Sequence, residues 1–323
     1  MKINSTLILF LTTMIMGVMV SLSSNSFMMV WVGLEISMIS FIPLMTLKGF
    51  MGSESSIKYF IVQSVSSSIL MFGILTKLMF SYNFEMLIYI SLMIKVGLAP
   101  FHNWVLCVIE GLNYFLTILL LTLMKVVPIF LMSMLNSNFN FVVLMSIMTG
   151  SILGLNQVSI RKILGYSSIF NLGFIFSVIN MNSLWINYLI IYSMMLSIVI
   201  YLFFNLNLSY LNQMIMNEFN LKTKLSIWMC MLSLGGMPPM LGFINKIMIF
   251  EYLMNYSNYL LILIMIISSL MVMFYYMRVS FFSLLGFSIL MKWNLNCFNS
   301  SSWLFIMLNL MFFPIFMLFK SLT

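Results

Sequence analysis

The chain consists of long apolar segments that are separated by short polar ones. The apolar segments show no alternation of period two, and each is close to the ~20 residues that a helix needs to cross a bilayer. Strands of a membrane barrel would alternate, so we expect an all-α polytopic membrane protein. The pattern predicts eleven spans, at residues 3–22, 26–46, 58–80, 86–106, 113–135, 139–156, 161–180, 184–205, 224–250, 258–278 and 302–320.

Composition supports this class of protein. Hydrophobic residues make up 63% of the 323 residues, and only 6% of residues are charged, which is too few to cover the surface of a water-soluble chain. The net charge of +8 comes from scattered basic residues, so it does not indicate nucleic-acid binding. The three cysteines, Cys107, Cys230 and Cys297, lack the spacing of a metal or iron–sulfur site.

The distribution of basic residues predicts an orientation. Residues 3–22 are apolar for too long, without a small-residue cleavage site, to be a signal peptide, so they form the first span. With eleven spans, nine basic residues fall on the side of the N-terminus and two on the other side. Because positive charge accumulates on the inner side of membranes, the N-terminus should face the matrix or cytoplasm and the C-terminus the opposite side.

Four charged residues lie inside predicted spans, namely Glu35, Lys95, Lys125 and Lys246. A charge at that depth costs about 2.5–3.5 kcal/mol on insertion scales, so such residues commonly mark ion or proton pathways. Proton transfer suits lysine, which can be both charged and neutral, whereas arginine stays charged. A Glu35–Lys95 pair would hold a proton and, on separation, release it toward the other two lysines. The alternative is a structural role, with the charges paired for assembly or snorkelling to the surface.

Two of these lysines lie beside predicted interruptions of their helices. Proline has no N–H to donate and glycine loosens a turn, so the carbonyls near such residues lose partners. In hydrocarbon this is tolerated only against protein or a wet cavity, although a simple kink packed against neighbours is the alternative. The residues of the two breaks are Gly97 and Pro100 after Lys95, and Gly235, Gly236, Pro238 and Pro239 before Lys246.

Interrupted helices at corresponding positions of two halves indicate a transport site of the inverted-repeat type. We therefore expect an antiporter-like inverted-repeat bundle with two broken helices, forming one transmembrane domain over residues 1–323. The first half-repeat would cover residues 1–135, the second residues 139–280, and a final helix residues 302–320. His102, Glu110 and Glu251 are weaker candidates, and no phosphate loop, nucleophile–base pair or haem or quinone signature predicts a redox or hydrolytic site.

Six stretches carry a resemblance to a known family. They occur in family order between residues 24 and 246 and read SNSFMMVWVGLEISMISFIPL, SESSIKYFIVQS, IKVGLAPFHNW, LTLMKVVP, GLNQVSIRKILGYSSI and LSLGGMPPMLGFINK. The chain resembles the antiporter-like membrane subunits of respiratory complex I, in their short animal mitochondrial form. Glu35, Lys95, Lys125 and Lys246 match the charged intramembrane positions of that family.

The resemblance implies a proton-translocating subunit of a respiratory NADH:ubiquinone oxidoreductase in the mitochondrial inner membrane. Its partners would be the other membrane-arm subunits, membrane lipids, and protons carried on internal water. FMN, iron–sulfur clusters and ubiquinone would be held by other subunits, with no cofactor or metal in this chain. The sequence leaves open a subunit of a multi-subunit cation/proton antiporter and a non-conducting membrane scaffold.

The chain departs from the family pattern in three places. Residues 171–174 read Asn-Leu-Gly-Phe where the family commonly has His or a similar residue followed by Leu-Gly-Trp. Leu-Met precedes Lys125 where Trp-Gln is common, and Ile-Asn precedes Lys246 where Leu-Pro is common. These departures affect secondary contacts of the expected relay and leave its four charges in place.

Overall fold

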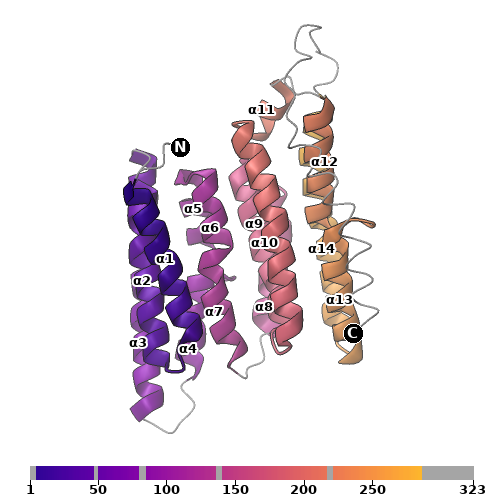
Figure 1. Cartoon of the computed structure of the whole chain (residues 1–323). Coiled ribbons are helices and arrows are strands. Elements are labelled where there is room, and N and C mark those ends of the chain that lie inside the picture. The colour runs from indigo at the N-terminus through magenta and orange to yellow at the C-terminus, as the bar shows by residue number, and fades with distance from the viewer. Residues whose placement is uncertain (1–4, 47–49, 80–84, 136–139, 217–220, 286–323) are drawn as a thin grey trace. The chain divides into compact units, whose positions relative to one another are not determined.

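The computed structural model describes residues 5–46, 50–79, 85–135, 140–216 and 221–285. Across these residues every named element is an α-helix, and the only β-type pairing is an isolated bridge between Ser159 and Tyr210. The chain divides into two compact units, residues 1–138 and 139–323, each of which is described by itself below (Figure 1). The all-α class is thus confirmed for the described residues, while the arrangement as one domain of two half-repeats stays a prediction.

The first unit contains seven helices among its described residues. α1 packs on α2, α2 on α3, and α3 on both α4 and α5, while α7 packs on α4 and α1 (Figure 1). Their bounds are α1 Ser5–Ser23, α2 Phe27–Thr46, α3 Phe50–Met79, α4 Glu85–Val96, α5 Asn103–Gly111, α6 Tyr114–Leu121 and α7 Leu123–Ser133.

The backbones of α1 and α2 approach each other at two glycines. A Cβ atom at position 33 would lie 2.7 Å from Gly17 O, and one at position 17 would lie 2.9 Å from Gly33 O. Small residues allow this approach between membrane helices, where packing rather than hydrophobic burial drives association. Because Gly33 is close in sequence to Glu35, the contact fixes the part of α2 that carries the predicted carboxylate.

The second unit is organised around α9, whose residues from Ile163 to Phe176 are all buried. α8 packs along α9, α14 packs on α8 and α12, and α10 contacts α12 and α13 (Figure 1). The helices are α8 Asn140–Gly154, α9 Ile160–Ser177, α10 Asn182–Asn205, α11 Leu211–Met216, α12 Leu221–Gly235, α13 Leu241–Asn255 and α14 Tyr259–Leu285.

Several predicted spans differ from the observed helices. The predicted spans 86–106, 113–135 and 224–250 each correspond to two shorter helices, α4 and α5, α6 and α7, and α12 and α13. By length and composition, six helical segments among the described residues are suited to crossing a membrane, with α6 and α7 together counted as one. The span predicted at 302–320, and Cys297, lie outside the described residues, so the count of eleven remains a prediction.

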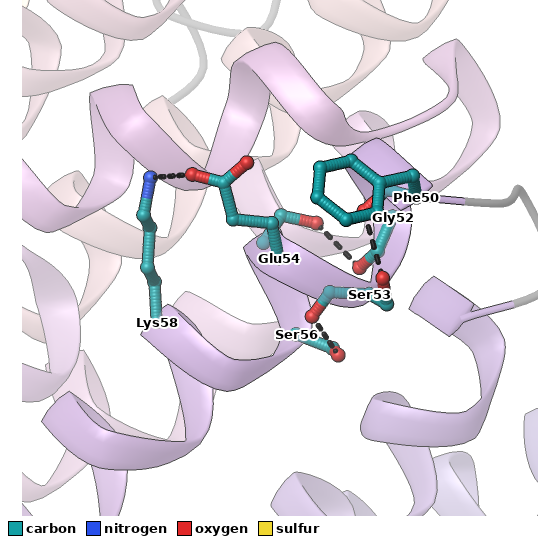
Figure 2. A network of polar contacts seen from close by, with 7 residues as sticks. Phe50, Gly52, Ser53, Glu54, Ser56 and Lys58 are labelled. Carbon is teal, nitrogen blue, oxygen red and sulfur yellow. Dashed lines mark hydrogen bonds and ion pairs between the residues drawn. The ribbon is translucent and has the colours of Figure 1, made fainter.

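α3 begins at Phe50, earlier than the predicted start at 58. Its 30 residues have a length of about 45 Å, which exceeds the ~30 Å of hydrocarbon in a bilayer. Figure 2 shows the extra turns, in which Lys58 Nζ contacts Glu54 Oε1 at 2.5 Å and serine hydroxyls donate back to carbonyls one turn earlier. Both charged side chains are about half exposed. Because these residues are polar, a prediction from hydropathy begins the span only at residue 58, at the end of these turns.

Candidate functional site

All three lysines that the sequence places inside spans are buried in the structure. The exposed fraction is 7% for Lys95, 5% for Lys125 and 6% for Lys246. Lys95 lies in the last turn of α4, Lys125 in the first turn of α7, and Lys246 in the first half of α13. Lys95 and Lys125 are therefore next to the end of their own helix, where backbone carbonyls or amides lack helical partners, and Lys246 is one turn further into α13.

α4 ends in a Schellman motif, the turn in which a left-handed residue closes a helix. Gly97 has φ = 77°, its N–H donates to Ile94 O at 3.2 Å, and the N–H of Leu98 donates to Met93 O at 3.1 Å. A Cβ atom at position 97 would overlap with Val105 Cγ2, so the turn needs glycine for space as well as conformation. The sequence predicts that carbonyls around residues 93–96 lose their normal helical partners, which is wrong for Met93, because the N–H of Gly97 also donates to Met93 O at 3.0 Å.

Two side chains bind the next carbonyls of this helix end. Trp104 Nε1, at the start of α5, donates to Ile94 O at 2.9 Å. Gln63 Nε2, on α3, donates to Lys95 O over a longer distance of 3.5 Å. The end of α4 is therefore held by polar groups from two neighbouring helices, as the interior of a membrane protein requires.

Lys95 and Lys125 line the same pocket in the first unit. The pocket is large enough to hold a water molecule, and its polar lining would supply hydrogen-bond partners. Besides the two lysines, its polar side chains are Ser37, Tyr59, Gln63 and Trp104. The structure thus brings together two of the four charged residues that the sequence singles out.

Glu35 lies on α2 beside this pocket. Leu34 and Ser37 from the same turns line the pocket, while Glu35 Oε1 is buried and has no hydrogen-bond partner. The carboxylate is near enough to act electrostatically on Lys95 and on Tyr59. Among the described residues Glu35 and Lys95 form no direct ion pair, so the predicted pairing is an interaction over a longer distance here.

The helix that carries Lys125 is also interrupted, which the sequence analysis missed. Thr122 separates α6 from α7, with φ = −117° and ψ = −76°. Its hydroxyl donates to Ile118 O at 2.7 Å, a backward bond of the kind that bends helices. Pro128, one turn and a half later, lacks the N–H that would bind the carbonyl of Met124. Threonine followed by proline is the signal that could have indicated this interruption.

The second unit contains a Schellman motif of the same kind at the end of α12. Gly236 has φ = 75°, its N–H donates to Ser233 O at 3.1 Å, and the N–H of Met237 donates to Leu232 O at 3.1 Å. Pro238 and Pro239 follow, before α13 begins at Leu241. Lys246 Nζ reaches back from α13 and donates to Gly235 O at 2.6 Å.

Lys246 also lines a polar pocket of the second unit. Tyr188 OH donates to Asn171 Oδ1 at 2.8 Å across this pocket, and Tyr192 and Ser233 complete its polar lining with Asn245. Like the pocket of the first unit, it is large enough for a water molecule. Phe170 lies below the ammonium, with 5.9 Å between Lys246 Nζ and the ring centroid.

Comparison with known proteins decides the family. The sequence profile of the NADH:quinone oxidoreductase/Mrp antiporter transmembrane family matches residues 24–85 and 81–272. NADH-ubiquinone oxidoreductase chain 2 of Anopheles gambiae is 39% identical over 289 residues, which cover 84% of each chain. The chain 2 of Locusta migratoria is 39% identical over 291 residues, 86% of this chain and 85% of its own. The chain belongs to the NADH-ubiquinone oxidoreductase chain 2 family.

The fold of this chain 2 family member is shared with solved structures of lower sequence identity. A chain of respiratory complex I from Thermus thermophilus with bound aureothin matches with a TM-score of 0.80 at 19% identity, covering 96% of this chain and 78% of that chain. A chain of the Mrp complex from Dietzia sp. DQ12-45-1b matches with a TM-score of 0.73 at 16% identity, covering 84% of this chain and 59% of that chain.

The weaker candidates of this chain 2 family member lie outside the two pockets. His102 is buried in the break, with Nδ1 3.2 Å from Pro100 O, and Glu110 and Glu251 are exposed. Cys107 and Cys230 form no disulfide, and among the described residues no group of three or more His, Cys, Asp or Glu could hold a metal ion. The sequence analysis missed Trp104, Tyr188 and Tyr192, which line the two pockets. A single aromatic residue within an apolar segment carries no sequence signal of such a role.

Proposed function

We propose that the chain is a proton-translocating membrane subunit of the respiratory NADH:ubiquinone oxidoreductase, complex I. Protons would pass along Glu35, Lys95, Lys125 and Lys246 while electrons are transferred in other subunits. The observation that carries this proposal is the pocket that Lys95 and Lys125 share, both buried and both beside an interrupted helix. Membership of the chain 2 family, whose members are named as parts of NADH-ubiquinone oxidoreductase, supports it.

The chemistry follows from the placement of these groups. A lysine in an apolar interior gains little hydration, so its ammonium form depends on nearby dipoles, charges and water. Glu35 is on α2 beside the pocket that Lys95 lines, so its carboxylate would be the counter-charge of the ammonium, and neutralising that carboxylate would allow the proton to leave into the shared pocket. At Lys246 the Gly235 carbonyl accepts the N–H bond, and the Asn171–Tyr188 pocket offers sites for water.

The wider setting belongs to the same proposal. The subunit would lie in the mitochondrial inner membrane with eleven spans, its N-terminus in the matrix and its C-terminus in the intermembrane space. It would contact other membrane-arm subunits and lipids. FMN, iron–sulfur clusters and ubiquinone would belong to other subunits, so the chain contributes to NADH:ubiquinone reductase activity without a redox group of its own.

The two other readings are less well supported. The fold is shared with a chain of an Mrp complex, but this chain covers only 59% of that chain against 84–85% of the chain 2 relatives. A non-conducting scaffold would not require buried lysines at helix interruptions, because each costs free energy that an apolar residue would not.

Substitution of Lys125 in the intact complex tests the proposal. We expect Lys125→Ala to lower the number of protons pumped per electron in reconstituted complex, measured relative to the amount of assembled enzyme. Lys77→Ala is the matched control, because Lys77 is about one-third exposed and pairs with Glu85 at 3.3 Å at the end of α3. Normal pumping per electron in the Lys125 variant would contradict the proposal. Loss of assembly with normal pumping in the remainder would favour the scaffold.

A further inference from the structure

We infer that Trp104 is a positioning residue for Lys95. Its indole N–H would hold the carbonyl of Ile94 and thereby keep the last turn of α4, and with it the lysine, at the pocket shared with Lys125. This inference rests on the proposed function, since it assigns a further residue to the same proton path.

The hydrogen bond from Trp104 is made to the peptide group that joins Ile94 to Lys95. Trp104 Nε1 lies 2.9 Å from Ile94 O, the usual distance for a good N–H···O bond. The carbonyl of Ile94 and the N and Cα atoms of Lys95 belong to one planar peptide group. Holding that oxygen therefore restrains the orientation of the plane from which the lysine side chain starts. The other donor to Ile94 O is the N–H of Gly97, at 3.2 Å.

The indole is itself held in place by neighbouring rings. Its centroid lies 6.0 Å from that of Tyr59 on α3, and Tyr59 in turn packs edge-on against Phe41 on α2 at 5.4 Å. Both Tyr59 and Phe41 are almost fully buried. Trp104 thus connects the end of α4 to α3 through Tyr59, and to α2 through Phe41. Gln63, also on α3, donates to the carbonyl of Lys95 at the same helix end.

Side chains bind different carbonyls at the two breaks. Lys246 follows its break and binds the carbonyl of Gly235 with its own ammonium group. Lys95 precedes its break and lines the pocket, and the carbonyl before it accepts the indole N–H of Trp104 in addition to the backbone N–H of Gly97. An indole N–H cannot titrate in the physiological range, so it fixes the turn without taking part in proton transfer.

The test uses Trp104→Phe in the intact complex, because phenylalanine keeps an aromatic ring and removes the N–H. The matched control is Trp31→Phe, since Trp31 Nε1 also donates to one carbonyl, Ser67 O at 3.3 Å, between α2 and α3 and outside the pocket lining. The first readout is backbone hydrogen exchange at Gly97 and Leu98, whose amides close the turn. The second is the number of protons pumped per electron, normalised to assembled complex.

We expect exchange at Gly97 and Leu98 to rise about fivefold in Trp104→Phe, the effect of losing one hydrogen bond of ~1 kcal/mol. Pumping per electron should fall at least twofold, and Trp31→Phe should change neither readout at this turn. Unchanged exchange, or normal pumping despite faster exchange, would overturn the inference. Should Trp104→Phe not assemble, a density map of the native complex decides, and an indole nitrogen more than 4 Å from Ile94 O overturns the inference.

Lys95→Ala in the same assay separates this inference from the proposed function. If Lys95→Ala pumps normally, the proton path through Lys95 is wrong, whatever Trp104 does to the turn. If Lys95→Ala fails to pump while Trp104→Phe pumps normally, the path stands and the positioning role of Trp104 is wrong.

Discussion

Lys246 Nζ donates a hydrogen bond of 2.6 Å to the carbonyl of Gly235, eleven residues earlier in the chain. The carbonyl belongs to the last residue of α12, where the helix has no amide left to offer. The buried lysine and the interrupted helix therefore satisfy each other. Each would be costly alone in an apolar interior, and together they form a compact polar centre in the second unit.

Gly236→Ala should disturb this centre directly. Residue 236 has φ = 75°, and a Cβ atom there would lie 2.9 Å from Lys246 Cε and 3.0 Å from its Nζ. We expect fewer protons pumped per electron and a stability loss of about 1 kcal/mol or more from the left-handed backbone. Gly154→Ala is the control, because Gly154 is on α8, does not line the pocket of Lys246, and its Cβ atom would meet the ring of Tyr275 at 3.0 Å. Equal pumping in both variants would argue against a role for the Lys246 position.

Lys95→Arg separates a proton carrier from a static charge. Arginine keeps the positive charge but does not release its proton, so a relay through Lys95 should stop while a fixed electrostatic interaction with Glu35 persists. We expect a marked drop in protons pumped per electron with assembly preserved. Lys95→Ala removes charge and titration together and should fail in either case. Pumping near the wild-type value in the arginine variant would exclude Lys95 as an obligatory carrier.

Glu35→Gln should reduce pumping and coupled turnover while assembly stays largely intact. The substitution removes a charge that acts on Lys95, yet it breaks no hydrogen bond at Glu35 Oε1, which has none. Glu54→Gln serves as the control, because its pairing with Lys58 is exposed and screened by solvent. Loss of the complex with normal specific activity in the remainder would indicate a structural role for Glu35.

The predicted topology can be tested with tags at both ends of the chain. With nine basic residues on one side and two on the other, an eleven-span chain should have its N-terminus in the matrix and its C-terminus in the intermembrane space. Protease protection in mitochondria and in mitoplasts would locate each tag. Tags protected on the same side would rule out an odd number of spans.

The parts of the fold that were predictable have local causes. Hydropathy gives the helical class, and residues that cannot donate an N–H or that favour positive φ indicate where α4 and α12 end. The early start of α3 was missed because its first turns contain three serines and the exposed pair of Glu54 and Lys58, so a hydropathy pattern excludes them although they are helical. The start of the predicted span marks where apolar residues begin, which differs from where the helix begins.

The contacts between helices could not be predicted in the same way. The bond from Trp104 to Ile94 joins two sides of a break, and the bond from Tyr188 to Asn171 joins α10 to α9. Neither pairing follows from spacing along the chain, because it depends on how the helices pack. The interruption at Thr122 has a local cause, the backward bond of its hydroxyl to Ile118 O, but that bond alone did not make it predictable. Threonine forms the same bond in many helices that continue without a break.

The contact of Gly17 with Gly33 determines what can move near Glu35. Because the two backbones touch, α2 cannot slide along α1 or turn about its own axis without separating them. The contact therefore restrains the segment of α2 that carries the carboxylate. A switch that preserves this contact would act through side-chain rotation and water exchange around Glu35.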